Sequence, residues 1–110
     1  MGLDGKEQIL RFAKDGDVLV NEIAPRPHNS GHWSMDGAVT SQFENHIRAV
    51  CSLEKVQLKK ISNAKMINLI GNDINEFRQN AKLNDNEYFF DYLKKEVKEK
   101  RKMGHITTLI

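Results

Sequence analysis

Two short apolar runs joined by the dipeptide Asp15-Gly16 constrain the fold of the first part of the chain most strongly. The runs extend from Ile9 to Ala13 and from Val18 to Ile23, and Asp-Gly is one of the dipeptides that best suit a tight hairpin turn. The sequence therefore predicts a β-hairpin. In its second strand the two-residue period places Glu22 on the same face as two valines, so a carboxylate ends an otherwise apolar row.

The segment from Ala24 to Trp33 has the composition of a binding loop. It reads Ala-Pro-Arg-Pro-His-Asn-Ser-Gly-His-Trp, in which the prolines stiffen the backbone, Gly31 permits unusual dihedral angles, and most other side chains are polar. Such a density of polar groups in a rigid loop suggests a functional site. His28 and His32 are four residues apart, but a proline-flanked loop is not a helix face and no third ligand is evident, so zinc is disfavoured.

The remaining patterns predict one helix and three strands. Thr40 or Ser41 can cap a helix that continues to about Cys51, and its apolar residues recur at helical spacing, so we expect it to pack rather than to do chemistry. Cys51 is expected to be a small buried residue of this helix. Gly71-Asn72-Asp73 is expected to end the first of the strands. The predicted strands are Met66 to Ile70, Tyr88 to Leu93 and Met103 to Ile110.

Composition limits the classes of protein to which the chain can belong. With 110 residues and a net charge of +2, it suits one small domain and argues against bulk nucleic-acid binding. No run reaches the ~18 uninterrupted apolar residues of a membrane span, and Met1 to Lys6 lacks the pattern of a signal peptide, so we expect a cytoplasmic protein. The single cysteine excludes an internal disulfide and a cysteine-based zinc site.

Four blocks of the sequence, taken in order, resemble one known family. The first is the run from Val20 to Trp33, and the later blocks are Thr40 to Glu44 with His46 and Arg48 to Val50, then Met66 to Gly71, then Arg101 to Ile106. Together they resemble the 5-(carboxyamino)imidazole ribonucleotide synthetases, ATP-grasp ligases also called the ATPase subunit of phosphoribosylaminoimidazole carboxylase. Four ordered blocks over most of the chain make coincidence implausible.

The resemblance implies an α+β fold and a place in de novo purine biosynthesis. Residues 1–53 would form the end of an ATP-grasp domain, a hairpin and a helix; residues 54–62 a linker; and residues 63–110 a small β-rich C-terminal subdomain. In the reaction that the resemblance implies, ATP activates bicarbonate as carboxyphosphate, and the carboxyl group passes to the exocyclic amine of aminoimidazole ribonucleotide. Such a site needs Mg²⁺, cations around the phosphate oxygens, and exclusion of water.

The resemblance also assigns roles to individual residues, all of types that suit this chemistry. Carboxylates suit a hard cation such as Mg²⁺, and arginine and lysine suit phosphate and bicarbonate. The implied assignments are Asn21 and Glu22 for ATP, Glu22 also for Mg²⁺, Arg26, His28 and Asn29 for the carboxylation centre, and Lys94 and Arg101 for the ribonucleotide phosphate and the transferring group.

The sequence departs from the family in two places and leaves other functions open. Where a second metal-binding carboxylate is expected, it has Ile9 and Leu10, with Glu7 too early unless the strand shifts register. Where the family usually shows an Arg-Pro-Gly turn, it has Lys98, Glu99 and Lys100.

Because the family's N-terminal domain and central lid have no counterpart here, we expect a shortened, split or decayed protein that is inactive without a complementing chain. The alternatives are a folded remnant without function and a small basic module that binds anions or nucleic acid through Lys94 to Lys102. The second is disfavoured because no aromatic residues are interleaved as stacking platforms. Alternating charges of this kind are also typical of a solvated face or a mobile connection.

Overall fold

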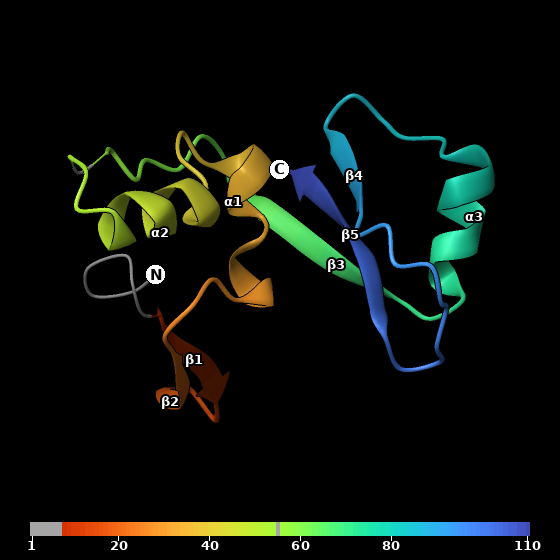
Figure 1. Ribbon diagram of the computed structural model, residues 1–110. Helices are drawn as coiled ribbons and strands as arrows, with labels where there is room; N and C mark the ends of the chain where they lie inside the picture. The colour runs from red at the N-terminus through yellow and green to blue at the C-terminus, as the bar shows by residue number, and fades with distance from the viewer. Residues whose placement is uncertain (1–7, 55) are drawn as a thin grey trace. The chain divides into compact units, whose positions relative to one another are not determined.

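A computed structural model describes residues 8–54 and 56–110 of the chain, which divides into unit 1, Met1–Lys60, and unit 2, Ile61–Ile110 (Figure 1). Predictions that involve Met1 to Lys6, Glu7 or Lys55 lie outside the described residues. The elements are β1 (Gln8–Lys14), β2 (Asp17–Ala24), η1 (Asn29–Gly31), α1 (Ser34–Gly37), α2 (Gln42–Val50), β3 (Ala64–Ile70), α3 (Asp73–Asn80), β4 (Glu87–Asp91) and β5 (Lys102–Leu109). This mixture of helices and strands confirms the predicted α+β class. In the part of the chain that is described, no helix has the length and apolar character to cross a membrane.

The predicted hairpin is confirmed, with one irregularity that matters for the site. Asp15 and Gly16 have φ angles of 51° and 84°, the left-handed values that a two-residue hairpin turn with matching twist requires. β1 and β2 pair antiparallel, but Leu10 pairs with Glu22 and the next residue pairs with Val20, so Asn21 is an extra residue in β2. Because such a bulge interrupts the two-residue alternation, the prediction that Glu22 continues the face of Val20 is wrong.

α2 begins and ends close to the predicted positions, but its expected packing is not observed. The Ser41 hydroxyl accepts a hydrogen bond from the Glu44 N–H at 3.2 Å and so caps the helix. Ile47 and Val50, however, are 58% and 56% exposed, and Cys51 is exposed rather than buried. The physical reason is that the buried residues in the described part of unit 1 are mainly polar, and of the apolar residues of α2 it is Phe43, at 38% exposed, whose ring contacts His32.

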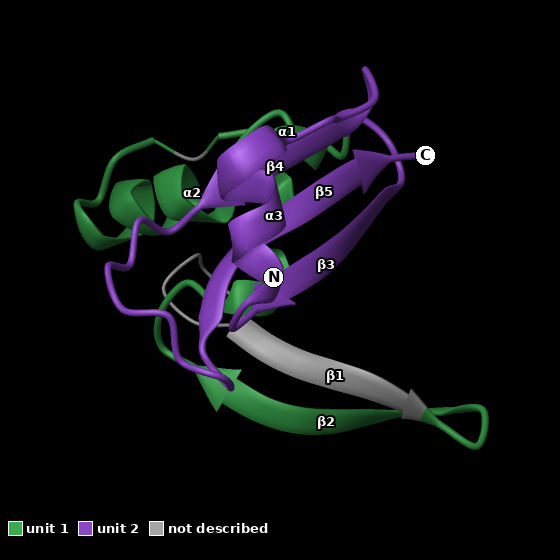
Figure 2. Ribbon diagram, turned by 90° about the vertical axis from the view of Figure 1, so that its right-hand side faces the viewer, with its two compact units in different colours: residues 1–60 green, residues 61–110 purple. Residues whose placement is uncertain are grey.

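Unit 2 contains the hydrophobic core. β5 lies between β3 and β4 and pairs antiparallel with both, and α3 lies across one face of this sheet (Figure 2). All three predicted strands are confirmed, with shifted ends. The fully or nearly buried core residues are Leu69, Ile74, Met103 and Ile106, with Phe77, Phe89 and Val97 packed against them. The sheet and helix therefore bury a continuous apolar layer between them.

The sequence does not predict α3, because Gly71-Asn72-Asp73 indicates only the end of a strand. The helix buries Ile74 completely and Phe77 in part, and its remaining residues are polar. Two apolar residues at a spacing of three are too few to indicate a helix by periodicity. The available signal was electrostatic, since acidic residues occupy the first turn and Arg78 the last, as the helix dipole favours.

A bidentate ion pair between α3 and the sheet explains why β4 ends earlier than predicted. Arg78 Nε lies 2.7 Å from Asp91 Oδ2, and its Nη2 donates to Asp91 Oδ1 at 2.9 Å and to the Lys94 carbonyl at 3.1 Å. Asp91 Oδ1 also accepts a hydrogen bond from the Leu93 N–H at 2.8 Å. Leu93 itself has a left-handed φ of 59°, which bends the chain away from the strand direction. The chain therefore turns out of the strand at Asp91.

The Arg78–Asp91 pair predicts how unit 2 responds to acid. The hydrogen bonds from Arg78 hold the pKa of the Asp91 carboxyl below its ordinary value. A lowered folded-state pKa contributes stability that is present above the unfolded pKa of about 3.9 and is lost as the pH falls through the folded pKa. Asp91→Asn should therefore lower the thermal unfolding midpoint of unit 2 at neutral pH, and the gap from wild type should close in acid. The exposed Asp85→Asn is the control, and equal effects of the two variants at neutral pH would contradict the prediction.

A second prediction concerns the close approach of the β4–β5 connection to Gly71. Gly71 has a φ of +58°, and an added Cβ would lie 2.6 Å from the Glu99 carbonyl oxygen. Gly16 has a φ of +84° with nothing within 4 Å, so Gly16→Ala reports the cost of the backbone conformation alone. Gly71→Ala should cost roughly 1–3 kcal/mol more, because the backbone of the connection must move. Native-state hydrogen exchange in β5 and β2 measures the two losses, and similar losses would count against the clash.

Candidate functional site

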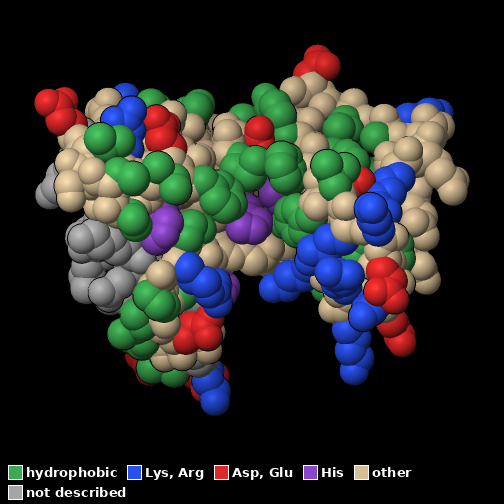
Figure 3. Space-filling view, viewed as in Figure 1, with side chains coloured by type: hydrophobic (Ala, Val, Ile, Leu, Met, Phe, Trp, Pro, Cys, Tyr) green, Lys and Arg blue, Asp and Glu red, His purple; other side chains and the backbone are tan. Residues whose placement is uncertain are grey.

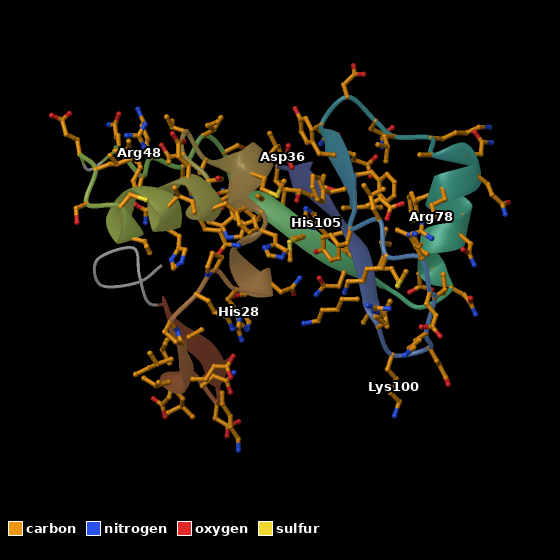
Figure 4. The ribbon with its side chains drawn as sticks, in the orientation of Figure 1. His28, Asp36, Arg48, Arg78, Lys100 and His105 are labelled. Atoms are coloured by element: carbon orange, nitrogen blue, oxygen red, sulfur yellow. The ribbon has the colours of Figure 1, made fainter. Side chains whose placement is uncertain are left out.

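In unit 1 a contact between side chains joins His28 to Glu22. His28 lies just before η1 in an extended conformation, and its Nδ1 accepts a hydrogen bond from the Ser30 N–H at 3.1 Å. The Ser30 hydroxyl lies 2.9 Å from the same nitrogen. A ring nitrogen that accepts a main-chain N–H bears no proton, so the proton of the neutral ring is assigned to Nε2. Nε2 of His28, which is labelled in Figure 4, lies 3.0 Å from Glu22 Oε1 and therefore donates to the carboxylate.

Glu22 provides one carboxylate to this part of the chain and does not form a metal site with its described neighbours. Its cross-strand partner is Leu10, at one of the two positions where the family's second carboxylate is expected. Among residues 8–54 and 56–110, the structure contains no cluster of three or more histidine, cysteine, aspartate or glutamate side chains that could hold a metal ion. Glu22 alone does not satisfy the coordination that Mg²⁺ requires.

The other residues predicted for the carboxylation centre lie on the same segment but are not all brought together. Arg26 is exposed, and its Nη1 donates to the carbonyl of the adjacent Pro27 at 3.2 Å. The Asn29 carbonyl accepts the His32 N–H at 3.1 Å, which helps to close η1. Asn21 is exposed at the bulge of β2. Of the predicted residues in unit 1, the described contacts therefore join Glu22 and His28 directly.

Sequence reasoning missed the residue that holds this segment in place. Gln42, the first residue of α2, is only 1% exposed. Its Oε1 accepts the His28 N–H at 3.1 Å, its Nε2 donates to the His28 carbonyl at 2.8 Å, and the same Nε2 lies 2.7 Å from His32 Nδ1. A glutamine next to a helix cap normally suggests an exposed polar position, so the pattern contained no signal for this role.

A second buried polar group completes the connection between α2 and η1. The Ser34 hydroxyl donates to the Gly31 carbonyl at 2.6 Å and accepts the Gln42 main-chain N–H at 2.9 Å. Gly31 is buried, and an added Cβ would lie only 2.4 Å from Gln42 Oε1. Glycine is therefore required here because of close packing against the glutamine amide rather than because of an unusual φ.

The predicted substrate cations lie in unit 2 on the connection between β4 and β5, and both are tied to main-chain carbonyls. Lys94 Nζ donates to the Lys102 carbonyl at 2.7 Å and lies 5.6 Å from the centroid of the Tyr92 ring. Arg101 Nη1 donates to the Glu96 carbonyl at 3.2 Å. Figure 3 shows lysine and arginine side chains gathered on this part of unit 2. The structure therefore places both cations at the ends of one connection.

Hydrogen bonds shape the connection, although it has Lys98, Glu99 and Lys100 where the resemblance leads us to expect an Arg-Pro-Gly turn. The Arg101 N–H donates to the Lys98 carbonyl at 3.0 Å, which closes a four-residue turn. The Gly71 N–H donates to the Arg101 carbonyl at 2.8 Å and fixes the end of that turn to the end of β3. Lys98, Glu99 and Lys100 thus form a hydrogen-bonded turn with a different sequence.

His105 lies in β5 and contacts Tyr92, the residue whose ring lies next to the Lys94 ammonium. It is fully buried, its Nδ1 lies 2.8 Å from the Tyr92 hydroxyl, and its ring stacks on Phe90 at a centroid distance of 5.7 Å. Tyr92 in turn lies under the Lys94 ammonium. This aromatic cluster supports Lys94 from the sheet side, and His105 has a packing role that the sequence did not reveal.

Two family descriptions match separate parts of the chain. The ATP-grasp domain matches residues 2–43, and the phosphoribosylaminoimidazole carboxylase C-terminal domain matches residues 64–110. The first covers the segment that contains Glu22 and His28. The second covers the segment that contains Lys94 and Arg101.

Individual relatives give the same result. The N5-carboxyaminoimidazole ribonucleotide synthase of Bacillus subtilis is 47% identical over 96 residues, which are 87% of this chain and 25% of the relative. The N5-carboxyaminoimidazole synthetase structure from Staphylococcus aureus has a TM-score of 0.74 and 40% identity, with 87% of this chain and 26% of that chain covered. The Aspergillus clavatus enzyme in complex with ADP and 5-aminoimidazole ribonucleotide has a TM-score of 0.79 and 34% identity, covering 91% of this chain and 29% of that chain.

The matches name the same enzyme family and cover a similar share of each curated relative. The chain spans about a quarter of the length of the curated relatives it matches, 25% and 24% in the first two. The two matched domains follow one another in the order that the sequence blocks indicated. Over these residues the chain belongs to the N5-carboxyaminoimidazole ribonucleotide synthase family of ATP-grasp proteins.

Proposed function

We propose that this chain contributes the carboxylation loop and part of the ribonucleotide site to a ligase that uses ATP and bicarbonate to carboxylate aminoimidazole ribonucleotide. The observation that supports this most strongly is the Glu22–His28 contact, at 3.0 Å, within the run that resembles the family signature. The relative from Aspergillus clavatus, described as a complex with ADP and 5-aminoimidazole ribonucleotide, supports the same substrates.

The proposed reaction transfers a carboxyl group in two balanced steps. A bicarbonate oxygen attacks the γ-phosphorus of ATP, and ADP leaves, which gives the mixed anhydride carboxyphosphate. The exocyclic amine of the ribonucleotide then attacks the carboxyl carbon, loses a proton, and releases inorganic phosphate. Negative charge shifts among oxygen atoms in both steps. Fixed cationic donors stabilise the transition states of these steps, and exclusion of water from the site protects the carboxyphosphate.

Within unit 1, the proposed carboxylation centre comprises Arg26, His28 and Asn29. The Arg26 guanidinium is exposed and presents a planar fork of donors suited to bicarbonate or to carboxyphosphate. His28 is held at the start of η1 with Nε2 as its proton-bearing atom. Asn29 follows it at the first position of η1. All three side chains would face the transferring carboxyl group.

The nucleotide would be bound by Asn21 and Glu22, with Glu22 as one oxygen ligand of Mg²⁺. The bulge at Asn21 supports this role, because bulges re-aim side chains next to active sites. The remaining Mg²⁺ ligands would have to come from groups outside the described residues, since these contain one carboxylate at this position and no metal cluster. The described residues of this chain would therefore hold Mg²⁺ only together with further ligands.

In unit 2, Lys94 and Arg101 would bind the ribonucleotide phosphate and the transferring group. Both side chains donate to neutral carbonyls, so their charges are not neutralised by carboxylates at these contacts. Arg78 Nη2 donates a hydrogen bond to the Lys94 carbonyl at 3.1 Å, and this bond fixes the start of the connection. Lysine and arginine on a hydrogen-bonded backbone suit a phosphate ligand.

We further propose that the chain is inactive alone and needs a complementing chain or a longer chain. Val18, Val20 and Ile23 of β2 are 70%, 63% and 61% exposed. A two-stranded hairpin is only marginally stable in water, and apolar residues on it are normally covered by further strands or helices. The chain matches 25% of the Bacillus subtilis relative, so we infer that the complementing or longer chain would supply the part that is not matched.

A graft tests the proposed activity. Residues 8–110 replace the matching segment of the Bacillus subtilis relative, and ATP hydrolysis that depends on both bicarbonate and aminoimidazole ribonucleotide is measured. We expect the graft to be active, and Arg26→Ala within it to lower kcat/KM by about 100-fold, the usual cost of removing one charge-stabilising donor. Lys59→Ala, which removes an exposed cation in the same unit, is the control.

The outcomes of the graft experiment separate the claims. A folded graft without activity, beside an active parent enzyme, would overturn the proposed function. An active graft in which Arg26→Ala behaves like Lys59→Ala would overturn only the role of Arg26.

Binding to the isolated chain is a separate prediction. In a two-dimensional amide NMR titration with Mg²⁺-ATP, and then with aminoimidazole ribonucleotide and bicarbonate, we expect saturable shifts confined to residues 22–31 and 94–101. Shifts produced by nucleic acid, limited to residues 94–102 and abolished by moderate salt, would instead favour the small basic module. A folded spectrum that does not change with any of these ligands would favour the remnant without function.

A further inference from the structure

The side-chain amide of Gln42 is paired with both main-chain polar groups of a single residue, His28. Oε1 accepts the His28 N–H at 3.1 Å, and Nε2 donates to the His28 carbonyl at 2.8 Å. The arrangement is that of two residues facing each other in an antiparallel sheet, with an amide side chain in place of the second strand. Because two bonds act on the two sides of one Cα, they fix the orientation of that residue and not only its position.

Burial of Gln42 shields its two hydrogen bonds to the His28 main chain from water. Gln42 is 1% exposed, so its amide exchanges few of these bonds with water. Nε2 also lies 2.7 Å from His32 Nδ1, and the Gln42 main-chain N–H donates to Ser34 Oγ at 2.9 Å. Both ends of the glutamine are therefore held, and the amide has one orientation in which its donor and acceptor match their partners.

The fixed main chain of His28 determines where its ring lies. With φ of −122° and ψ of 149°, His28 is extended and its Nδ1 can reach forward to accept the Ser30 N–H. That bond leaves the proton on Nε2, which points to Glu22 at 3.0 Å. A chain of contacts thus connects the Gln42 amide to the proton-bearing atom of the histidine, through the His28 main chain.

Gly31 makes the approach of the amide possible. A Cβ at this position would lie 2.4 Å from Gln42 Oε1 and 2.8 Å from Gln42 Cδ. Any other residue would push the amide away from the His28 main chain. The short distance shows that the loop and the glutamine are mutually fitted, and it provides a second way to disturb the amide without changing its chemistry.

We propose that Gln42 is a positioning residue that sets the tautomer of His28 and holds the imidazole Nε2–H against Glu22. Its importance for catalysis rests on the proposed function, but its effect on the ring does not. A merely structural glutamine would stabilise unit 1 without controlling which ring nitrogen bears the proton. The tautomer is therefore the deciding observable.

The first test uses the full chain, labelled with ¹⁵N, at a pH well above the ordinary histidine value of about 6.5. Long-range ¹H–¹⁵N spectra of the His28 ring report which nitrogen is protonated. Gln42→Glu keeps an acceptor for the His28 N–H but loses the Nε2 donor, and Gln42→Met keeps the length and loses both. In wild type and in the exposed control Gln57→Glu we expect the Nε2–H form. In both Gln42 variants the two ring nitrogens should shift towards the average of the two tautomers.

Folding is monitored in the same samples through the amide signals of α2 and η1. If Gln42→Met does not fold, Gln42→Glu decides, and Gly31→Ala displaces the amide by an independent route. Folded Gln42→Glu and Gly31→Ala variants that both retain the wild-type His28 tautomer would overturn the proposal. Loss of the Nε2–H preference in the folded variants, with the Gln57→Glu spectrum unchanged, supports it.

The second test measures catalysis in the Bacillus subtilis graft. Gln42→Glu should lower kcat by roughly 10- to 100-fold, as loss of a supporting hydrogen bond does, while KM for ATP stays close to that of the unmodified graft. Unchanged kcat in an active graft would overturn the catalytic part of the proposal. An inactive unmodified graft would count against the proposed function instead, and the tautomer result would still decide whether Gln42 positions His28.

Discussion

In the described part of unit 1, the buried amide of Gln42 is the main link between the loop after β2 and α2. The loop after β2 has two prolines, two histidines and a glycine within a few residues, and none of these supplies an apolar core. The contacts of Gln42 with the His28 main chain, at 3.1 and 2.8 Å, replace that core as the element that fixes the loop to α2. Hydrogen bonds are directional, so they specify the orientation of His28 more closely than apolar packing of the same area could.

Unit 2 is stabilised differently. Its sheet and α3 enclose Leu69, Ile74, Met103 and Ile106, and a bidentate ion pair ties the helix to the end of β4. The core places the strands, and the fork of Arg78 then places the first residues of the connection that contains Lys94. In unit 2 the Arg78–Asp91 ion pair acts on a packed core, whereas in the described part of unit 1 polar contacts hold the loop to α2.

Local signals made much of this predictable from the sequence. The hairpin follows from Asp15-Gly16, and α2 follows from its Ser41 cap and helical spacing. α3 was missed because Ile74 and Phe77 give too little periodicity. The role of Gln42 was missed because its partner lies fourteen residues away, and no local pattern encodes a side chain that pairs with a distant main chain. The family signature did indicate Glu22 and His28, but the bulge that re-aims Glu22 depends on strand register, which the sequence does not specify.

The way in which the cations of unit 2 are held bears on what they can bind. Lys94 and Arg101 donate to carbonyls at 2.7 and 3.2 Å, whereas Arg78 is paired with the Asp91 carboxylate. A carboxylate partner would neutralise a cation and compete with an incoming anion, whereas a carbonyl orients it and leaves its charge in place. This division gives Arg78 a structural role and supports the proposal that Lys94 and Arg101 bind an anionic ligand. The same separation of roles holds in unit 1, where Gln42 fixes the loop without charge and Glu22 meets only the neutral donor of His28 among its described contacts.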